Sequence, residues 1–343
     1  MSAPRELLKL LTERRNLTEA QAGELLAHLT DAELPPPLAG ALIAALATKG
    51  VVADEVRGLA RTMRRLARRP DIPSDLRAID IVGTGGDASG SFNISTGTAL
   101  LTAACGLPVV KHGNRSVSSR CGSADVLEAL GVRVDLSPQQ AGACLAETGL
   151  CFLFAPLYHP AMKHIAPVRK DLGFRTVFNL LGPLSNPARV PRQLLGVFAE
   201  RWVEPMAGVL AELGTKRAWV VHGSDGMDEL TITGPSVVVE VFDGKKCKFE
   251  IEPGRIGLGR ATLDSVKGGD ATYNAGELDE LLKGRGNEAY RDIVILNSAA
   301  ALTVSGKAET IEEGAEIARR ALHDGRARAK LEELRRATQG FAA

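Results

Sequence analysis

The sequence predicts an α/β protein in which a small all-helical domain precedes a large α/β domain with a mostly parallel central sheet flanked by helices. The chain has 343 residues, which is more than one compact core usually holds. Its first seventy residues carry helical patterns throughout. From residue 78 onward, short apolar runs alternate with helical segments, which is typical of a parallel sheet covered by helices on both faces.

Four helices are expected in the first seventy residues. They are ELLKLLTERR (6–15), a helix over 19–30 with Thr18 as its cap, PPPLAGALIAALATKG (35–50) and ADEVRGLARTMRRLARR (53–69). Pro70 should end the last helix, and DIPSDLRA (71–78) indicates a linker. One side of that last helix is apolar and arginines fill the rest, for which a solvated face is a better explanation than phosphate binding.

The alternating region yields the second domain. Strands are expected at 78–82, 107–113 and 151–156, and helices at about 93–106, 123–132 and 137–149, the last capped by Ser137. A helical segment over 160–190 interrupts the pattern, which resumes with strands at 193–198 and 218–223 around a helix at 202–214. Residues 231–253 indicate antiparallel strands that turn at Asp243-Gly244, and three helices should close the chain. The predicted small domain is 1–72 with the returning segment 160–190, and the large domain is 73–159 with 191–343.

Composition excludes several classes of protein. A formal net charge of +1 and an aromatic content of 4% argue against a nucleic-acid-binding protein, so no nucleic-acid partner is expected. The five cysteines contain no CxxC pair and are expected to be buried small hydrophobes in a reducing compartment. The N-terminus lacks a secretory pattern, and the longest apolar stretch, 37–47, is too short to span a bilayer. The expectation is a soluble, cytoplasmic protein with no membrane partner.

Two polar loops follow strands and point to a phosphorylated ligand. The first, GTGGDASGSFNIST (83–96), places four glycines between a strand and a helix that opens at Asn93. Backbone N–H groups of such a loop and the N-terminus of the helix both favour an anion, although a tight turn capped by Asn93 is the plain alternative. The second loop lies within KHGNRSVSSRCGSADVLEALG (111–131) and combines Lys111, Arg115 and Arg120 with four serines. So long a polar loop costs ordering entropy that a ligand with many oxygens would offset.

A third stretch, HGSDGMDELTITGPS (222–236), follows another strand and contains adjacent Asp228 and Glu229. Beside a phosphate site, such carboxylates suit Mg²⁺, which binds through one or two carboxylates together with substrate phosphates. Taken alone, they fit a solvated turn equally well. Residues and spacing together therefore predict a magnesium-dependent enzyme that acts on a phosphorylated ligand.

The chain also resembles a known family. GTGGD (83–87), NIST (93–96), KHGNRSVSSRCGSADVLEALG (111–131), HPAMKHIAPVRKDLGFRTVFNLLGPLSNP (159–187) and HGSDGMDELTITGPS (222–236) are similar, in order, to motifs of the anthranilate phosphoribosyltransferases. The resemblance implies a fold shared with the pyrimidine nucleoside phosphorylases and assembly as a homodimer. It also implies transfer of the phosphoribosyl group of phosphoribosyl pyrophosphate to the amine of anthranilate, in tryptophan biosynthesis.

The same resemblance implies roles for particular residues. Lys111 and His112 are the expected catalytic residues. Ser95, Asp228 and Glu229 would bind or support magnesium, and Gly83, Asn114 and Arg169 would hold anthranilate. The residues expected to contact phosphoribosyl pyrophosphate are Gly83, Gly86, Asp87, Ser91, Asn93, Ile94, Ser95, Thr96, Lys111, His112, Gly113, Asn114, Arg115, Ser116, Val117, Ser118, Ser119 and Ser123.

Several residues and readings remain open at this level. His159 and His164 are expected to be structural or supporting residues, and Tyr158 and Cys121 are given no role. The alternative functions are a pyrimidine nucleoside phosphorylase, which KHGNRSVSS followed by CGSAD does not suit, and a nucleic-acid-binding paralogue without transferase activity, favoured only by the Arg-rich helix 57–69. Residues 83–96 are expected to be mobile without ligand and to become ordered on binding.

Overall fold

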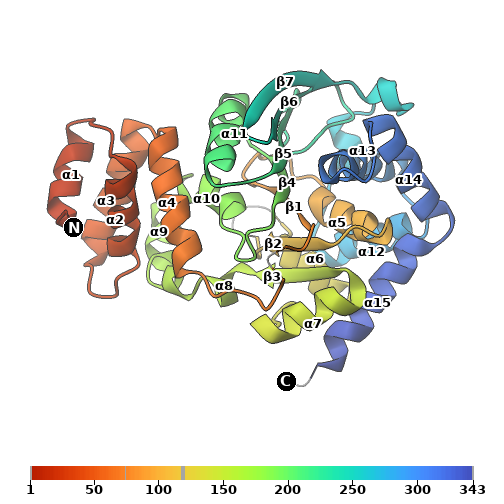
Figure 1. Ribbon diagram of the computed structural model, residues 1–343, viewed down its shortest axis with the longest axis horizontal. Coiled ribbons are helices and arrows are strands. Elements are labelled where there is room, and N and C mark those ends of the chain that lie inside the picture. The colour runs from red at the N-terminus through yellow and green to blue at the C-terminus, as the bar shows by residue number, and fades with distance from the viewer. Residues whose placement is uncertain (1, 74, 117–119, 342–343) are drawn as a thin grey trace.

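The computed structural model describes residues 2–73, 75–116 and 120–341. A bundle of N-terminal helices lies at one end of the molecule, and a sheet surrounded by helices lies at the other (Figure 1). The predicted class, a small helical domain with a large α/β domain, is confirmed. Within the described ranges, no helix is both long and apolar enough to cross a membrane.

The N-terminal helices are α1 (Pro4–Thr12), α2 (Glu19–Leu29), α3 (Pro36–Lys49) and α4 (Ala53–Leu66). The predicted cap of α2 is confirmed, because the Thr18 hydroxyl accepts a hydrogen bond from the Gln21 N–H at 3.2 Å. The prediction that α4 continues to residue 69 is wrong. Ala67 has extended backbone angles, and the Arg68 N–H donates to the Tyr158 carbonyl at 2.8 Å, which takes the chain out of the helix toward the α/β domain.

The sheet has seven strands in the order β3-β2-β1-β4-β5-β6-β7. They are β1 (Ile79–Gly83), β2 (Val109–Gly113), β3 (Leu150–Phe154), β4 (Arg192–Gly196), β5 (Arg217–Gly223), β6 (Ser236–Phe242) and β7 (Lys245–Ile251). The first five are parallel, and β6 and β7 add an antiparallel hairpin at one edge. Its turn is the predicted one, since Asp243 and Gly244 have φ values of 46° and 77°, as a two-residue hairpin of type I′ requires.

Helices cover both faces of the sheet. They are α5 (Ile94–Ala104), α6 (Ser123–Ala129), α7 (Pro138–Thr148), α8 (Ala155–Tyr158), α9 (Ala166–Leu172), α10 (Phe178–Leu184), α11 (Val203–Glu212), α12 (Ala271–Leu282), α13 (Glu288–Ser305), α14 (Ile311–His323) and α15 (Arg326–Gly340). The Ser137 cap of α7 is confirmed, because its hydroxyl accepts the Gln140 N–H. The prediction of three closing helices is wrong, because four described helices follow β7; Gly325, with a φ of 80°, separates α14 from α15.

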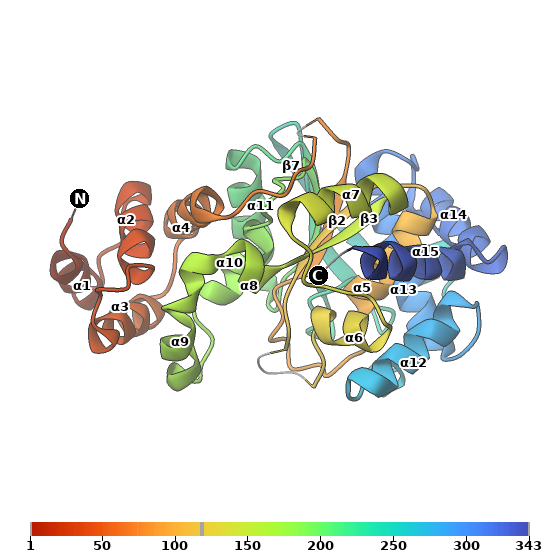
Figure 2. The same cartoon turned by 90° about the horizontal axis from the view of Figure 1, so that it is seen from below.

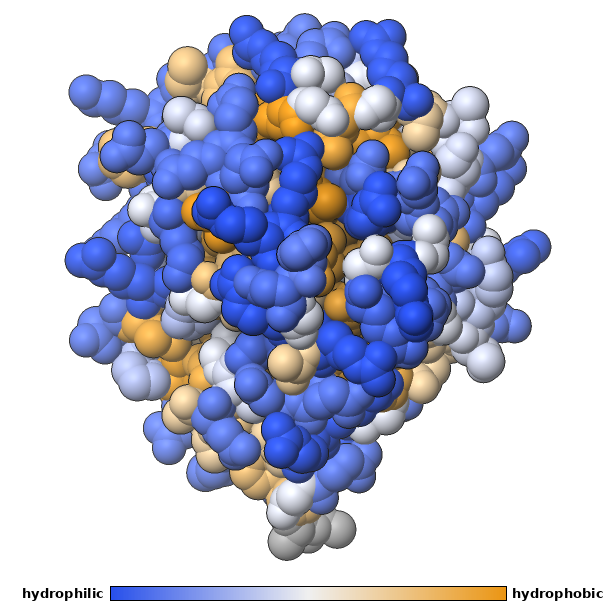
Figure 3. Space-filling view, turned by 90° about the vertical axis from the view of Figure 1, so that its right-hand side faces the viewer, coloured by the Kyte–Doolittle hydropathy of each residue, from blue (hydrophilic) through white to orange (hydrophobic). Residues whose placement is uncertain are grey.

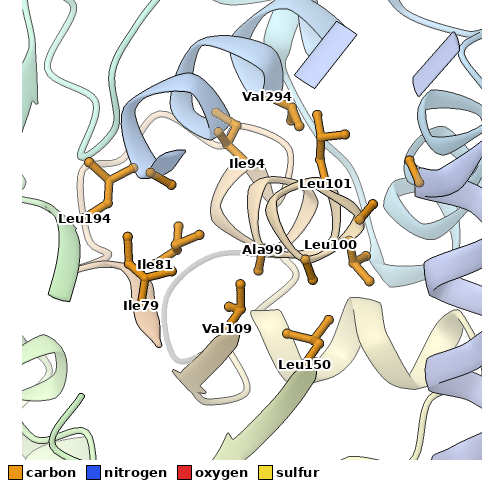
Figure 4. Close-up of a cluster of buried hydrophobic side chains, with 14 of the residues drawn as sticks. Ile79, Ile81, Ile94, Ala99, Leu100, Leu101, Val109, Leu150, Leu194 and Val294 are labelled. Carbon is orange, nitrogen blue, oxygen red and sulfur yellow. The ribbon is translucent and has the colours of Figure 1, made fainter. Parts of the chain in front are cut away.

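Two hydrophobic cores lie on opposite faces of the sheet. On one face, α5 packs between the strands and α13, with Ile81, Leu101 and Val294 among the side chains that meet there (Figure 4). On the other face, α10 and α11 pack on the strands, and their core continues without a break into the helical bundle. The outer surface over the C-terminal helices is mostly hydrophilic (Figure 3). The bundle therefore packs on α10 and α11, which lie between it and this face of the sheet.

The segment expected at 160–190 does return to the bundle. A short 3-10 helix at Pro160–Lys163 leads into α9, which packs against α3, and α10 packs against α4, as Figure 2 also shows from below. Four cysteines are buried, as expected. The prediction is wrong for Cys247, which is exposed because it lies on β7 at the edge of the sheet.

Candidate active site

The candidate site lies where the strand order reverses, between β1 and β4, and at the carboxyl ends of these strands. Gly83 and Gly196 end the two strands and face each other in register, and Asp228 lies over both. A Cβ on Gly83 would lie 2.8 Å from Cγ of Asp228, and one on Gly196 would lie 3.2 Å from its Cα and closer to its carbonyl group. Both positions therefore require glycine if Asp228 is to lie over the strand ends. Open parallel sheets bind their ligands at this kind of place.

The glycine loop and the acidic pair, which are more than 130 residues apart in sequence, are hydrogen-bonded to each other. The Gly85 N–H donates to Oδ2 of Asp228 at 2.6 Å, and the Asp228 N–H donates to Oδ2 of Asp87 at 3.4 Å. The carboxylate of Glu229 accepts the Ser95 N–H at the start of α5. The structure thus brings the first and third predicted stretches together into one acidic site.

The buried carboxyl groups of Asp228 and Glu229 and the half-buried Asp87 repel each other. Burial, and then the neighbouring Asp87, raises the pKa of Asp228 to about 7, and burial together with Asp228 raises the pKa of Glu229 well above its ordinary value. A divalent cation would remove both penalties, and the donors are oxygens, which Mg²⁺ prefers. In the part of the chain described, no three His, Cys, Asp or Glu side chains converge on one point as a complete metal site. The residues therefore fit a magnesium ion whose coordination is completed by substrate oxygens.

Lys111 connects the acidic site to the second strand loop. Its Nζ donates to the Ile81 carbonyl at 2.6 Å and to Oγ of Ser95 at 3.0 Å. Burial lowers its pKa, and Asp80, Glu229 and Asp228 oppose that shift. A buried ammonium group held this close to Ser95 places positive charge beneath the loop, where an anionic ligand would lie.

The second loop is folded around its own acidic groups. Asp125 accepts N–H groups from Ser116 and Gly122, and the Ser123 hydroxyl donates to the Asn114 carbonyl at 3.2 Å. The Arg115 guanidinium pairs with Glu128 and lies 5.4 Å from the centroid of the Phe154 ring. Gly113 lies at the start of this loop, where a Cβ would strike the ring of Phe152. Val117, Ser118 and Ser119 lie outside the described residues.

The remaining predicted phosphate contacts divide into backbone and side-chain types. Ile94 and Thr96 are buried, and their backbone N–H groups already donate to the Phe92 carbonyl at 2.8 Å and to the Asn93 carbonyl at 3.1 Å. Gly86 has a φ of 73°, as a tight anion-binding loop requires, and the Ser91 hydroxyl donates to the Phe92 carbonyl. The alternative that Asn93 caps α5 with its side chain is wrong. The side-chain N–H of Asn93 instead donates to the Cys121 carbonyl, and its Oδ1 accepts a hydrogen bond from Asn274.

Two buried histidines and an arginine lie around α10. The rings of His112 and His159 meet edge to face with centroids 5.1 Å apart, and Nδ1 of His112 lies 3.2 Å from the Gly182 carbonyl. Burial lowers the pKa of His112 to about 3 and that of His159 to about 4, so both rings are neutral at pH 7. The Arg169 guanidinium lies 4.8 Å from the centroid of the Phe178 ring. His164 is exposed, and the Tyr158 hydroxyl donates to the Leu136 carbonyl inside the core.

Sequence reasoning missed several residues that hold the glycine loop. Arg175 donates to the Gly86 carbonyl at 2.9 Å, and Asn274 donates to Oδ1 of Asn93 at 3.0 Å. The Gly268 N–H donates to the Gly90 carbonyl at 2.9 Å. In the sequence, the Gly-Gly pair at 268–269, directly before the helix cap Asp270, indicates a tight turn and could have identified the segment that contacts Gly90.

Comparison with known proteins defines the class first. A glycosyl transferase family model for a helical bundle domain matches residues 5–67, and a second for an a/b domain of that family matches residues 75–328. The fold and site described above are therefore those of a two-domain glycosyl transferase.

Individual relatives identify a narrower family within that class. The chain is 48% identical over 338 residues to the anthranilate phosphoribosyltransferase of Azorhizobium caulinodans, covering 98% of this chain and 97% of that one. It is 51% identical to that of Parvibaculum lavamentivorans, with 97% of each chain covered. Among solved structures, the Thermus thermophilus enzyme is 43% identical with a TM-score of 0.91, covering 97% of this chain and 99% of that one. The Saccharomyces cerevisiae enzyme in complex with PRPP and Mg is 26% identical with a TM-score of 0.90, covering 98% of each chain. The chain belongs to the anthranilate phosphoribosyltransferase family.

Proposed function

We propose that this protein transfers the phosphoribosyl group of 5-phosphoribosyl 1-pyrophosphate to the amine of anthranilate, giving N-(5-phosphoribosyl)anthranilate and pyrophosphate, in tryptophan biosynthesis. Family membership over nearly the whole chain supports the activity. The activity is assigned to particular residues because hydrogen bonds connect the glycine loop and α5 with Asp228, Glu229 and Lys111, at the point where the strand order of the sheet reverses.

The pyrophosphate end of the donor substrate belongs at the glycine loop and α5. The proposed contacts from the first loop are Gly83, Gly86, Asp87, Ser91 and Asn93 to Thr96, and those from the second are Gly113 to Ser119 with Ser123. The N-terminus of α5 opens on this loop, and its dipole favours an anion there, while the Ile94, Ser95 and Thr96 N–H groups already have partners within the protein. Because Arg115 is already paired with Glu128 and Asp125, its first role is to hold the second loop in shape.

Asp228, Glu229 and the Ser95 hydroxyl are the residues that would hold magnesium or its bound water. The ion would supply positive charge that stabilises the departing pyrophosphate. Lys111 adds a fixed positive charge next to Ser95 in a site from which water is largely excluded, where such a charge is most effective. This is the basis for naming Lys111 a catalytic residue.

The acceptor belongs on the α10 side of the site. Arg169 is largely withdrawn from water, which lowers its pKa, and no carboxylate in the described ranges pairs with it. A guanidinium of this kind suits the carboxylate of anthranilate in a two-point pair. His112 contacts α10 at Gly182 and Arg169 contacts it at Phe178, and Gly83 and Asn114 complete the expected set. We expect His112 to line the approach of the amine to the ribose, as the resemblance to the family implies.

In the reaction, the bond between the ribose anomeric carbon and the pyrophosphate oxygen breaks, and its electron pair leaves with the pyrophosphate. The anthranilate nitrogen forms the new bond and loses one proton. An arylamine is already unprotonated at neutral pH, so the chain needs no strong general base. Positioning of the two substrates and stabilisation of the leaving group then account for most of the acceleration.

The test is the loss of anthranilate fluorescence in the presence of phosphoribosyl pyrophosphate, with and without Mg²⁺. Turnover should need the metal and should fall severely in Lys111→Ala and in the double variant Asp228→Ala with Glu229→Ala. Undiminished turnover in both variants would contradict the site assignment. Phosphorolysis of a pyrimidine nucleoside without anthranilate turnover would instead favour the nucleoside phosphorylase, and DNA binding without any response to the pyrophosphate would favour the nucleic-acid-binding paralogue.

We further propose that the protein works in the cytoplasm as a homodimer. Its helical domain consists of residues 1–72 with the returning segment 160–190, and its substrate-binding domain consists of 73–159 and 191–343. The loop 83–96 becomes ordered when the pyrophosphate binds. Sedimentation of the purified protein tests the dimer, and hydrogen exchange across 83–96 with and without substrate tests the ordering.

A further inference from the structure

A cavity of about 310 Å³ lies on the side of the molecule where α4 packs against α10 and α11 (Figures 1 and 2). It is lined by Arg61, Arg64, Arg189, Val190, Glu212, Leu213, Gly214 and Thr215. These residues come from the helical bundle, from the segment before β4 and from the turn between α11 and β5. None of them belongs to the candidate active site.

Among the residues that line this cavity, positively charged side chains outnumber negatively charged ones. Glu212 pairs with Arg57, and Arg61 pairs with Glu19 while donating to the Glu212 carbonyl, so these charges are compensated. Arg64 and Arg189 make no ion pair with a carboxylate anywhere in the described ranges. The cavity therefore holds two excess positive charges, with Arg65, Arg68 and Arg69 following on the same stretch of chain.

The two excess arginines are connected through the backbone of Arg64. Nε of Arg64 donates to the Leu184 carbonyl at 2.6 Å, and a terminal nitrogen of Arg189 donates to the Arg64 carbonyl at 2.9 Å. Each guanidinium keeps further N–H groups for another acceptor. Burial, and then the charge of Arg189, lowers the pKa of Arg64 to about 10, and Asp80 opposes this shift.

We propose that this cavity is a second anion site, which binds the phosphate group of a small phosphorylated molecule between the Arg64 and Arg189 guanidinium groups. Two forked guanidinium groups can share the three terminal oxygens of a phosphate monoester, whereas one guanidinium already satisfies a carboxylate. The cavity is larger than a phosphate group alone needs, and it lies in the size range of small-molecule sites. A ligand there would bridge the bundle and the α/β domain.

The probe is inorganic phosphate, titrated by calorimetry into the protein without Mg²⁺ or substrates, at constant ionic strength set with sodium chloride. Arg189→Gln is the main variant, because its side chain is exposed and its loss leaves the core intact. Arg64→Gln is the second, and Arg65→Gln is the matched control, an exposed arginine of α4 outside the cavity. Acetate replaces phosphate in a parallel titration.

Phosphate should bind the wild-type protein and Arg65→Gln equally, and at least about tenfold more weakly to Arg189→Gln and Arg64→Gln. Acetate should bind at least about tenfold more weakly than phosphate. Bound phosphate should raise the unfolding temperature of the wild-type protein more than that of Arg189→Gln, since both proteins keep the phosphate-binding loops of the active site. Equal phosphate affinity in Arg189→Gln and Arg65→Gln, or equal affinity for acetate and phosphate, would overturn the proposal. Transferase turnover without added phosphate should be the same in Arg189→Gln and wild type, so this test is independent of the proposed function.

Discussion

Replacing Gly83 with alanine should disable the site without unfolding the protein. The added Cβ would lie 2.8 Å from Cγ of Asp228, whereas carbon atoms that do not repel each other lie about 3.5–4.0 Å apart. Asp228 must therefore move by about 1 Å, and in doing so it weakens the 2.6 Å hydrogen bond from the Gly85 N–H. A displacement of about 1 Å in a catalytic group costs about 100-fold in rate.

We expect kcat/KM of Gly83→Ala to fall about 100-fold in the anthranilate fluorescence assay, and the Mg²⁺ concentration for half-maximal rate to rise. Gly276→Ala is the matched control, because no atom lies within 4 Å of its added Cβ in α12. That variant should keep wild-type turnover and be slightly more stable, since alanine favours a helix by about 1 kcal/mol over glycine. A folded Gly83→Ala protein with more than half of the wild-type rate would refute the reasoning about Asp228.

Three other predictions concern the supporting structure. Asn274→Ala should raise the KM for phosphoribosyl pyrophosphate about tenfold in steady-state assays, because the Asn93 side chain loses the donor that orients it. An unchanged KM would show that Asn274 does not support the glycine loop. Glu55→Ala should destabilise the protein by about 3–5 kcal/mol in urea unfolding, because it leaves the buried Lys49 charge unpaired, and a loss below about 1 kcal/mol would show that the pair is not needed. Burial lowers the pKa of His159 to about 4 in the folded protein, below its value in the unfolded chain, so the unfolded chain takes up a proton first as the pH falls. The free energy of unfolding is therefore largest above about pH 6.5 and should fall by about 2 kcal/mol by pH 5. In His159→Asn, the change in unfolding free energy between pH 6.5 and pH 5 should be smaller by that amount, and an identical pH dependence would contradict a neutral buried ring.

Local patterns predicted what local chemistry controls. The caps at Thr18 and Ser137, the hairpin turn at Asp243-Gly244 and the strand-loop-helix order were all readable, because each depends on residues close together in sequence. The end of α4 was misplaced because it depends on a hydrogen bond from Arg68 to the distant Tyr158 carbonyl. The alternative that Asn93 caps α5 failed for the same reason, since the partners of its side chain, Cys121 and Asn274, lie 28 and 181 residues away.

The sequence by itself determined the α/β class, the two phosphate-type loops and the acidic pair, and the similarity of its motifs indicated the family. Only the tertiary structure decided that Asp228 lies across the ends of β1 and β4, that Lys111 is held beneath Ser95, and that Arg115 is already paired with Glu128. It also separated the arginines of α4 into compensated and uncompensated ones. The physical reason is that propensities and periodicity act over a few residues, whereas charge pairing and close packing depend on which distant segments the sheet order brings together.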